Sequence, residues 1–392
     1  MASKVSGRLC FLVISLTIVL AVLSWDYWLE SISSSTFSGN PTEKDVLKGS
    51  ISPTKAATPM PLLSRSFFKR LPHFDFEEVY DMDAKSKQTT CAQSLRNSED
   101  QDFKKAFLPN IGLFLHKDSI NMSKWNQLSH FNNPFGFMEF HHDDVMPAVK
   151  LIPKPIEPLL SPKPGSGGCV RCAVVGGAGI LNGSKMGKEI DSHDYVFRMN
   201  GAVIKGYEED VGNRTSVYVH TAHSITTSLT VFKQYGYTSV PADEDIKFVL
   251  IPEGMRDFIW LKALIKREKF NKKVNEELYA GKYNESRFYV LHQDFLRYVR
   301  NRFLMSAHSK DSLWSIVSPS AGAFTLFLAL HTCDTVSAYG FMTENYKNFS
   351  NYYVQRNIKT RVAFFANHDY IQEMKLWKKL HQSKIIRLYE RV

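Results

Sequence analysis

Beyond residue 168 the chain alternates short apolar runs with segments whose apolar residues recur at helical spacing. The short runs predict strands over Cys172–Val175, Tyr195–Met199, Val217–His220, Lys247–Ile251, Phe288–Leu291, Thr335–Tyr339, Val362–Phe365 and Ile385–Leu388. The helical spacing predicts helices over Arg256–Glu268, Gln293–Leu304, Ala321–His331 and Asp369–His381. Strands separated by helices indicate an α/β fold with a Rossmann-like, mostly parallel sheet covered by helices on both faces. Ligands of such sheets bind beyond the carboxyl ends of the strands.

A charge-free, mostly apolar run from Leu9 to Leu23 lies near the N-terminus, after basic residues at positions 4 and 8. Extended to Trp25, the run is at the short end of what spans a membrane, and the preceding positive charge favours a cytoplasmic N-terminus. A cleaved signal peptide is the alternative, but no small-residue cleavage site follows, and the aromatic residues at 25, 27 and 28 suit a membrane interface. We therefore predict a cytoplasmic tail (1–8) and a signal-anchor helix (9–25), with the rest of the chain lumenal.

Residues 26–88 are rich in Ser, Thr, Pro and Lys and show no sustained apolar period. This composition predicts a flexible stem that holds the remainder of the chain away from the membrane. From residue 89 to the end at 392 the composition is that of a globular protein, and we predict one catalytic domain over that range. A Pro/Gly-rich patch at 151–168 is interpreted as a surface connection within this domain.

The chain of 392 residues carries a formal net charge of +10, which favours anionic ligands such as nucleotides, phosphates or acidic lipids. Nucleic acid is disfavoured, because the basic residues are spread along the chain and form no arginine-rich arm or Cys/His finger.

Five cysteines fit a lumenal location for most of the chain. Cys10 lies in the predicted membrane helix, and the other four form an even number in an oxidising compartment, which predicts two disulfides. A zinc site at Cys169-x-x-Cys172 is disfavoured, because no second Cys/His pair with ligand spacing lies nearby. Candidate N-glycosylation sequons are present at Asn121, Asn182, Asn213, Asn284 and Asn348.

A glycine-rich turn, GGAG at residues 176–179, follows the first predicted strand. The dinucleotide fingerprint G-x-G-x-x-G fails, because its third glycine falls on Asn182, and the P-loop spacing around Lys185 fails as well. What remains is a general device in which small residues let backbone N–H groups approach a phosphate or ribose.

The surrounding sequence is more specific than the glycines. CAVVGGAGIL, IDSHDYVFRMNGAVIKGYEEDVGNRTS, SPSAGAFTLFLALHTCDTVSAYGF and NHDYIQE resemble, in order and spacing, the motifs of animal sialyltransferases. The large motif covers 169–216, the small motif 318–341, and the very small motif H-x-x-x-x-E begins at His368. TTCAQSLR, HFNNPFGFMEF and LHQSKIIRLYERV resemble the branch that adds α2,6-linked sialic acid to O-linked N-acetylgalactosamine (GalNAc), its second member more than its first. The resemblance covers residues 89–392.

The resemblance implies a single-domain variant of the GT-A glycosyltransferase fold in a single-pass type II protein of the Golgi membrane. It implies CMP-sialic acid as the donor, O-glycoproteins carrying GalNAc or Gal-GalNAc as acceptors, and no cofactor and no metal. A basic, hydrogen-bonding site can stabilise a departing CMP without magnesium. Asp81-Met82-Asp83 has the spacing of a metal-binding D-x-D sequence but lies at the margin of the predicted stem. The implied disulfides are Cys91–Cys169 and Cys172–Cys333, with Cys169–Cys172 as the alternative.

The resemblance assigns His368 the role of general base in an inverting transfer. Asp369 with Gln372 resembles a helix N-cap, which places His368 on the loop before a helix whose positive end disfavours an imidazolium. Ile371, Met374, Trp377 and Leu380 are predicted to form the buried stripe of that helix. Glu373 lies about 140° around the helix from His368, so we predict a supporting role for it. A purely structural histidine is the alternative.

The donor-binding residues implied by the motifs are Gly176, Gly177, Asn200, Ser320, Ala321, Gly322, Tyr352 and Tyr353. For Ser320 the alternative is a plain helix N-cap. Three positions depart from the family pattern: Gly177 replaces an asparagine, Ala321 a hydroxyl residue, and Asn351 with Tyr352 and Tyr353 stands where a histidine is usual. These departures leave a second hypothesis open, a sialyltransferase-fold binding protein with weak or no turnover. The two tyrosines are predicted to replace the missing phosphate donor.

Overall fold

The order of the strands in the main sheet determines where the chain brings its motifs together. The computed structural model of the chain describes residues 58–66, 73–83, 89–270 and 273–391. In this part of the chain, seven strands form a sheet in the order β7-β4-β3-β2-β1-β8-β9, and every pair is parallel. The strands of this sheet are β1 (Arg171–Val175), β2 (Tyr195–Met199), β3 (Val217–His220), β4 (Lys247–Leu250), β7 (Phe288–Val290), β8 (Thr335–Tyr339) and β9 (Arg387–Leu388). A small antiparallel pair joins β5 (Lys269–Phe270) to β6 (Lys273–Val274).

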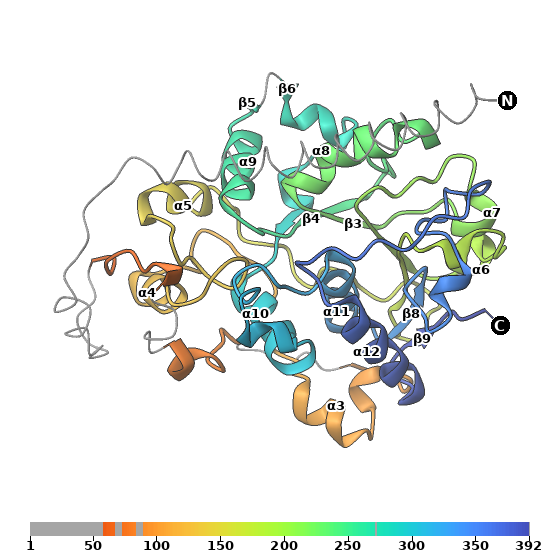
Figure 1. Cartoon of the computed structure of the whole chain (residues 1–392), viewed down its shortest axis with the longest axis horizontal. Helices are drawn as coiled ribbons and strands as arrows, with labels where there is room; N and C mark the ends of the chain where they lie inside the picture. Colours follow the sequence, from red (N-terminus) through yellow and green to blue (C-terminus); the bar gives the residue numbers. More distant parts are fainter. Residues whose placement is uncertain (1–57, 67–72, 84–88, 271–272, 392) are drawn as a thin grey trace, which may run out of the picture. The chain divides into compact units, whose positions relative to one another are not determined.

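Helices pack on both faces of the sheet, as the sequence predicts (Figure 1). The helices are α3 (Gln101–Ala106), α4 (Met122–Leu128), α5 (His142–Val149), α6 (Gly187–Asp191), α7 (Glu208–Val211), α8 (Ala222–Val231), α9 (Met255–Ile265), α10 (Gln293–Phe303), α11 (Ala321–Thr332) and α12 (Tyr370–Gln382). All four predicted helices are confirmed within a few residues. The α/β class is confirmed too.

Alternate residues of β1 belong to two separate hydrophobic cores, because neighbouring strand side chains point to opposite faces of the sheet. Cys172 and Val174 pack in the larger core, which also takes side chains from α9, α10, α11 and α12. Ala173 and Val175 pack in the smaller core, which includes residues of α6 and α7. Burial on both faces is why the central strands read as unbroken apolar runs.

The predicted strand Val362–Phe365 is wrong. These residues form an extended loop outside both sheets of the described chain, and Phe364 and Phe365 are exposed. An apolar run of this length satisfies the strand pattern, but here the side chains face solvent and no neighbouring strand pairs with the backbone. In α12, Trp377 and Leu380 are buried as predicted, whereas Ile371 is exposed.

Both disulfides implied by the resemblance are present. Cys91 bonds Cys169, and Cys172 bonds Cys333, so the alternative Cys169–Cys172 pair is not formed. The second bridge joins β1 to the residue after α11, just before β8, although 161 positions separate the two cysteines. It therefore links the large and small motifs covalently beside the strands that carry them.

Residues 77–83, which the composition assigns to the stem, contact α10 closely. Asn301 donates to the Glu77 carbonyl at 2.7 Å, and Arg297 donates to the Val79 carbonyl. The Asp81 amide donates to the carboxylate of buried Asp294 at 2.7 Å. The structure therefore places part of the predicted stem within the globular unit, to which all the described residues belong.

A buried lysine completes this contact. The Lys124 ammonium lies 2.8 Å from a carboxylate oxygen of Asp81 and 2.7 Å from one of Asp294, which also pairs with Arg297 at 2.9 Å. Burial would raise the pKa of Asp294, but the charges of His292, Arg297 and Lys124 outweigh it and lower that pKa. Asp81, His292 and Asp294 are close enough to resemble a metal-ligand set, but the ammonium already lies between the two carboxylates.

The predicted tail, the anchor helix and most of the stem lie outside the described residues. Within the described ranges, none of the helices has the length and apolarity to cross a membrane. The sequon residues Asn121, Asn213, Asn284 and Asn348 are exposed, and Asn182 is half-buried.

Candidate active site

The sequence motifs meet where the strand order reverses. β1 is flanked by β2 on one side and by β8 on the other, so the connections diverge at the carboxyl ends of β1 and β8. In open parallel sheets this crevice is the usual place of ligand binding. Gly176 directly follows β1 and Gly340 directly follows β8.

The glycines of the turn at 176–179 mainly allow its backbone to pack closely against the backbone at Gly340 and Ser350. A Cβ atom on Gly176 would lie 2.5 Å from the Gly340 carbonyl oxygen, and one on Gly179 would lie 2.0 Å from that of Ser350. The amides of Gly176 and Ala178 already donate to Tyr339 and Gly340 carbonyls. Among the described contacts of the turn, this leaves the amides of Gly177 and Gly179 for a ligand. The expectation that the whole turn presents N–H groups is therefore too broad.

Asn200, at the end of β2, presents an acceptor that no described residue satisfies. Its backbone is in the left-handed region (φ 52°), which asparagine tolerates better than most residues. The Tyr218 hydroxyl donates to its carbonyl at 2.6 Å and helps to hold this conformation. Its side-chain oxygen Oδ1 is buried without a hydrogen-bond partner in the described part of the chain. A buried unpaired amide oxygen at this edge is suited to an amino or hydroxyl donor of a ligand.

The N-terminus of α11 lies beside Asn200. A Cβ atom on Gly322 would lie 3.7 Å from Met199 Sδ, at the end of β2, and 3.8 Å from the ring of Phe341, which follows β8. Ala321 is buried in the first turn. The Ser320 hydroxyl accepts from the Ala323 amide at 3.1 Å, so Ser320 is a helix N-cap, the alternative that the sequence left open. The positive end of α11 thus faces the site, where it favours an anion.

His368 lies on the loop before α12, as predicted. Its ring nitrogen Nδ1 is 2.9 Å from the Ser318 carbonyl, which can only accept, so Nδ1 carries the proton. The other nitrogen, Nε2, then holds a lone pair, and the Asn367 side-chain amide lies 3.2 Å from it. Asp369 caps α12 by accepting from the Gln372 amide at 3.0 Å. Gln372 makes no reciprocal cap, since its side chain donates to the Met305 carbonyl.

Burial lowers the pKa of His368, although the hydrogen bond to Ser318 opposes the shift. A lowered pKa keeps the imidazole neutral to more acidic pH. If His368 is the base, transfer should therefore fall on the acid side only below about pH 6.5, the ordinary pKa of histidine. We expect the acid limb of log kcat against pH to have unit slope and a midpoint below that value. A midpoint above pH 6.5 would contradict the burial described here.

Glu373 joins the His368 helix to the start of α11. Its two carboxylate oxygens accept from the Ser320 amide and the Ser320 hydroxyl, each at 2.7 Å. Burial raises the pKa of Glu373 to about 7, against the effect of these hydrogen bonds. Its contacts are with Ser320 and not with His368, which fits the supporting role predicted from its angle around the helix.

The loop at 350–353 covers the glycine turn with one of its two tyrosines. A Cβ atom on Gly177 would lie 3.4 Å from the Tyr352 ring, and Ala178 and Tyr352 form an antiparallel bridge. Tyr353 instead lies in the smaller core and donates its hydroxyl to the Val203 carbonyl at 2.6 Å. Tyr352 therefore remains as the candidate phosphate donor. Asn351 accepts from the Ala363 amide at 3.2 Å and so ties this loop to the segment before His368.

Sequence reasoning missed a pair of carboxyl groups beyond the carboxyl end of β4. Asp257 accepts from the Ala222 and Gly254 amides, at 2.7 and 3.0 Å, and so holds the start of α8. Burial raises the pKa of Asp257 to about 6 and, with the charge of Asp257, that of Glu253 to about 8. Two acidic residues four positions apart carry no specific sequence signal, because only the fold buries them.

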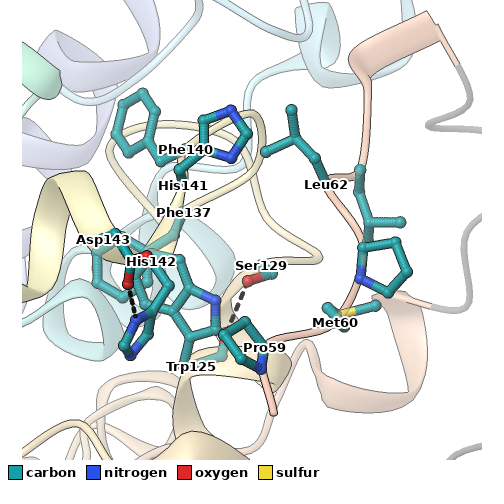
Figure 2. A pocket seen from close by; sticks show the side chains of 12 residues that line it. Pro59, Met60, Leu62, Trp125, Ser129, Phe137, Phe140, His141, His142 and Asp143 are labelled. Carbon is teal, nitrogen blue, oxygen red and sulfur yellow. Dashed lines mark hydrogen bonds and ion pairs between the residues drawn. The ribbon is translucent and has the colours of Figure 1, made fainter. Parts of the chain in front are cut away.

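The described chain also has a cavity of about 160 Å³ that contains none of the predicted site residues. Figure 2 shows that Pro59, Met60 and Leu62 line it from one side and Trp125, Phe137 and His142 from the other. The Met60 amide donates to the Asn126 side chain at 2.8 Å, which fixes this segment across α4. The cavity is a contact of the predicted stem and not part of the crevice between β1 and β8.

Comparison with known proteins agrees with this geometry. The family described as glycosyltransferase family 29 (sialyltransferase) matches residues 114–385. The chain belongs to this family of sialyltransferases. A solved structure titled "Crystal Structure of a Mammalian Sialyltransferase" superposes with a TM-score of 0.54 at 23% identity, covering 78% of this chain and 100% of that one. At 23% identity, this similarity shows that the two chains share a fold.

Two relatives help to place this sialyltransferase within the family. Human alpha-N-acetylgalactosaminide alpha-2,6-sialyltransferase 1 is 45% identical, over 84% of this chain and 57% of its own length. Human alpha-N-acetylgalactosaminide alpha-2,6-sialyltransferase 2 is 38% identical, over 81% of this chain and 88% of its own length. The predicted branch is confirmed, but these identities do not support the preference for its second member. The chain spans little more than half the length of the first relative.

Proposed function

We propose that the protein transfers sialic acid from CMP-sialic acid to the 6-hydroxyl of GalNAc in O-linked glycans, forming an α2,6 linkage with inversion. The observation that carries the proposal is the tautomer of His368, whose Nε2 holds the lone pair that can take a proton. The two relatives at 45% and 38% identity are both named as alpha-N-acetylgalactosaminide alpha-2,6-sialyltransferases, which supports the choice of linkage and acceptor. The anchor-like N-terminus supports a type II Golgi membrane location.

In the proposed reaction the acceptor O–H bond breaks as its proton passes to His368 Nε2. The oxygen bonds to the anomeric carbon, and the bond from that carbon to the phosphate oxygen breaks, with the electron pair leaving on CMP. The positive end of α11 and the Tyr352 hydroxyl stabilise the phosphate charge that develops. Asn200 Oδ1 accepts a hydrogen bond from the cytidine or ribose. The proposal needs no metal ion or other cofactor.

The departures from the family pattern favour a second candidate, a protein that binds the donor without turnover. Gly177 offers no side chain, and the Asn351 side-chain oxygen Oδ1 already accepts from the Ala363 amide. Mass spectrometry of the full-length chain with CMP-sialic acid and a Gal-β1,3-GalNAc glycopeptide separates the two. One added sialic acid, removed by an α2,6-cleaving sialidase, supports the enzyme. CMP binding without product supports the binding protein.

The two neighbouring tyrosines provide a matched pair of tests. We expect Tyr352→Phe to lower kcat about 10- to 100-fold, because it removes a donor to the phosphate. The melting temperature should fall less than in Tyr353→Phe, because the Tyr352 hydroxyl loses only its hydrogen bond with the Asn351 side chain. We expect Tyr353→Phe to lower the melting temperature, because the buried Val203 carbonyl loses its partner, while kcat of the folded protein stays within twofold. Steady-state kinetics and thermal unfolding of both variants check this. The opposite pattern would exchange the two roles.

A further inference from the structure

A row of aromatic rings runs outward from His368 to the protein surface. The His368 ring is 5.5 Å from Tyr370, Tyr370 is 5.7 Å from Phe364, and Phe364 is 5.8 Å from Tyr346, measured between centroids. Phe365 lies next to Phe364, and its carbonyl accepts from the His368 amide at 3.2 Å. We call Tyr346, Phe364, Phe365 and Tyr370 the aromatic rim.

The rim exposes large apolar side chains that the fold does not use. Phe364 is 48% exposed and Phe365 54%, within the sequence Ala363-Phe364-Phe365-Ala366. Ile371, in the first turn of α12, is also exposed. Single exposed apolar residues are ordinary, but a cluster beside a candidate catalytic residue indicates a binding surface.

Hydrogen bonds hold the rim in place without a ligand. The Ala363 amide donates to Asn351 at one end of the segment, and the Ser318 amide donates to the Asn367 carbonyl at the other, at 2.9 Å. Ser318 is also the partner of His368 Nδ1. Because the same residues position the imidazole and the exposed rings, a molecule on the rim has a fixed position relative to Nε2.

We propose that the aromatic rim binds the polypeptide of the acceptor glycoprotein, next to the glycosylated serine or threonine. The inference rests on the proposed function. O-linked GalNAc is attached directly to the peptide, so only one sugar ring separates its 6-hydroxyl from the backbone. When that hydroxyl reaches Nε2, the peptide must lie over the surface around His368, which is the rim.

The chemistry of the rim favours peptide over a further sugar. Sugar recognition needs polar groups that pair with hydroxyls. The Ala363–Ala366 segment offers none from its side chains, and the hydroxyls of Tyr346 and Tyr370 are the polar side-chain groups of the rim. Exposed aromatic rings do suit extended, proline-containing peptides, whose apolar rings pack on aromatic side chains. The occupant is therefore a segment with proline or other apolar residues flanking the glycosylated position.

The test compares two acceptors on the full-length chain in detergent: a short proline-rich peptide carrying one GalNAc on threonine, and methyl α-GalNAc. The variants are Phe365→Ser and the double variant Phe364→Ser with Phe365→Ser. The quantity compared is kcat/KM for the glycopeptide divided by kcat/KM for methyl α-GalNAc. We expect this ratio to fall about tenfold or more in both variants, because KM for the glycopeptide rises. Phe365→Ser is the cleaner variant, because Phe365 has no described ring contact with Tyr370. The control is Ile156→Ser, at a residue 60% exposed in the 151–168 connection, for which the ratio stays unchanged.

An unchanged ratio in the double variant would overturn the proposal, as would an equal loss with both acceptors, which would indicate that the rim only supports His368. Methyl Gal-β1,3-GalNAc is measured as a third acceptor, and a loss confined to it would overturn the proposal by showing that the rim binds sugar instead. If the wild-type chain transfers to neither GalNAc acceptor, the proposed function fails. Glycopeptide binding by fluorescence anisotropy with CMP present still tests the rim, with about a tenfold higher Kd expected in the double variant.

Discussion

Replacement of His368 by alanine is expected to lower kcat for sialyl transfer by about 10²- to 10⁴-fold, the usual contribution of a general base. The reason is the fixed tautomer. Ser318 holds the proton on Nδ1, so Nε2 is the atom that can take the acceptor proton. Because the loop is also held by the Ser318 amide and the Asp369 cap, the variant should keep its fold and its affinity for CMP.

The measurement is initial-rate kinetics with saturating CMP-sialic acid, together with CMP binding by calorimetry. His308→Ala is the matched control, because His308 is half-exposed in the short 3-10 helix Ala307–Lys310, and its side chain pairs with neighbouring Asp311 at 2.6 Å. That control should stay within twofold of the wild type. Normal transfer by the His368 variant would show that another group removes the proton.

Deletion of residues 56–83 is expected to destabilise the globular unit by about 2–4 kcal/mol, less than the full cost of breaking a buried ion pair, because the Asp81 side chain is 47% exposed and Lys124 keeps Asp294. The deletion removes Asp81 from Lys124, and it removes the Glu77 and Val79 carbonyls from α10. Lys124, Asp294 and Arg297 would remain buried with incomplete partners. For a domain of this size the loss corresponds to a fall in melting temperature on the order of 10 °C.

Thermal unfolding of two fragments of the chain, one beginning at residue 56 and the other at residue 84, measures this effect. Lys124→Met in the longer fragment should shift the melting temperature in the same direction, since it removes the ammonium that both Asp81 and Asp294 contact. Asp118→Ala is a suitable control, because the Asp118 side chain is 67% exposed and its distance to the His116 ring nitrogen, 3.8 Å, is long for an ion pair. Equal melting temperatures for the two fragments would show that residues 56–83 contribute nothing to stability.

The sequence predicts the fold well where burial determines the pattern. β1, β2 and β3 are covered on both faces, so their apolar runs are continuous and their bounds agree with the structure within about a residue. The same reasoning fails at Val362–Phe365, where an apolar run is exposed beside His368. A sequence pattern records that side chains are apolar and not whether protein or a ligand covers them.

The candidate site shows a similar division. His368 and the cap at Asp369 are local features that the sequence places correctly. The choice between Tyr352 and Tyr353 depends on which face of the loop meets the glycine turn, and only the long-range bridge between Ala178 and Tyr352 decides it. The contact between residues 77–83 and α10 could not be predicted from the sequence either, because the hydrogen-bonding partners lie more than two hundred positions apart.

Three carboxyl groups, the buried Asp257 and Glu373 and the half-buried Glu253, take up protons when the chain folds near neutral pH. Asp257, Glu373 and Glu253 have pKa values raised to about 6, 7 and 8, against ordinary values of 3.8, 4.5 and 4.5. Between those limits the folded chain keeps protons that the unfolded chain has lost, so each group lowers the free energy of unfolding by about 1.4 kcal/mol per unit of rising pH. Burial lowers the pKa values of His220, His292 and His368, which has the opposite effect below about pH 6.5. The loss of stability with rising pH is therefore expected above that value, where these imidazoles are neutral in both the folded and the unfolded chain.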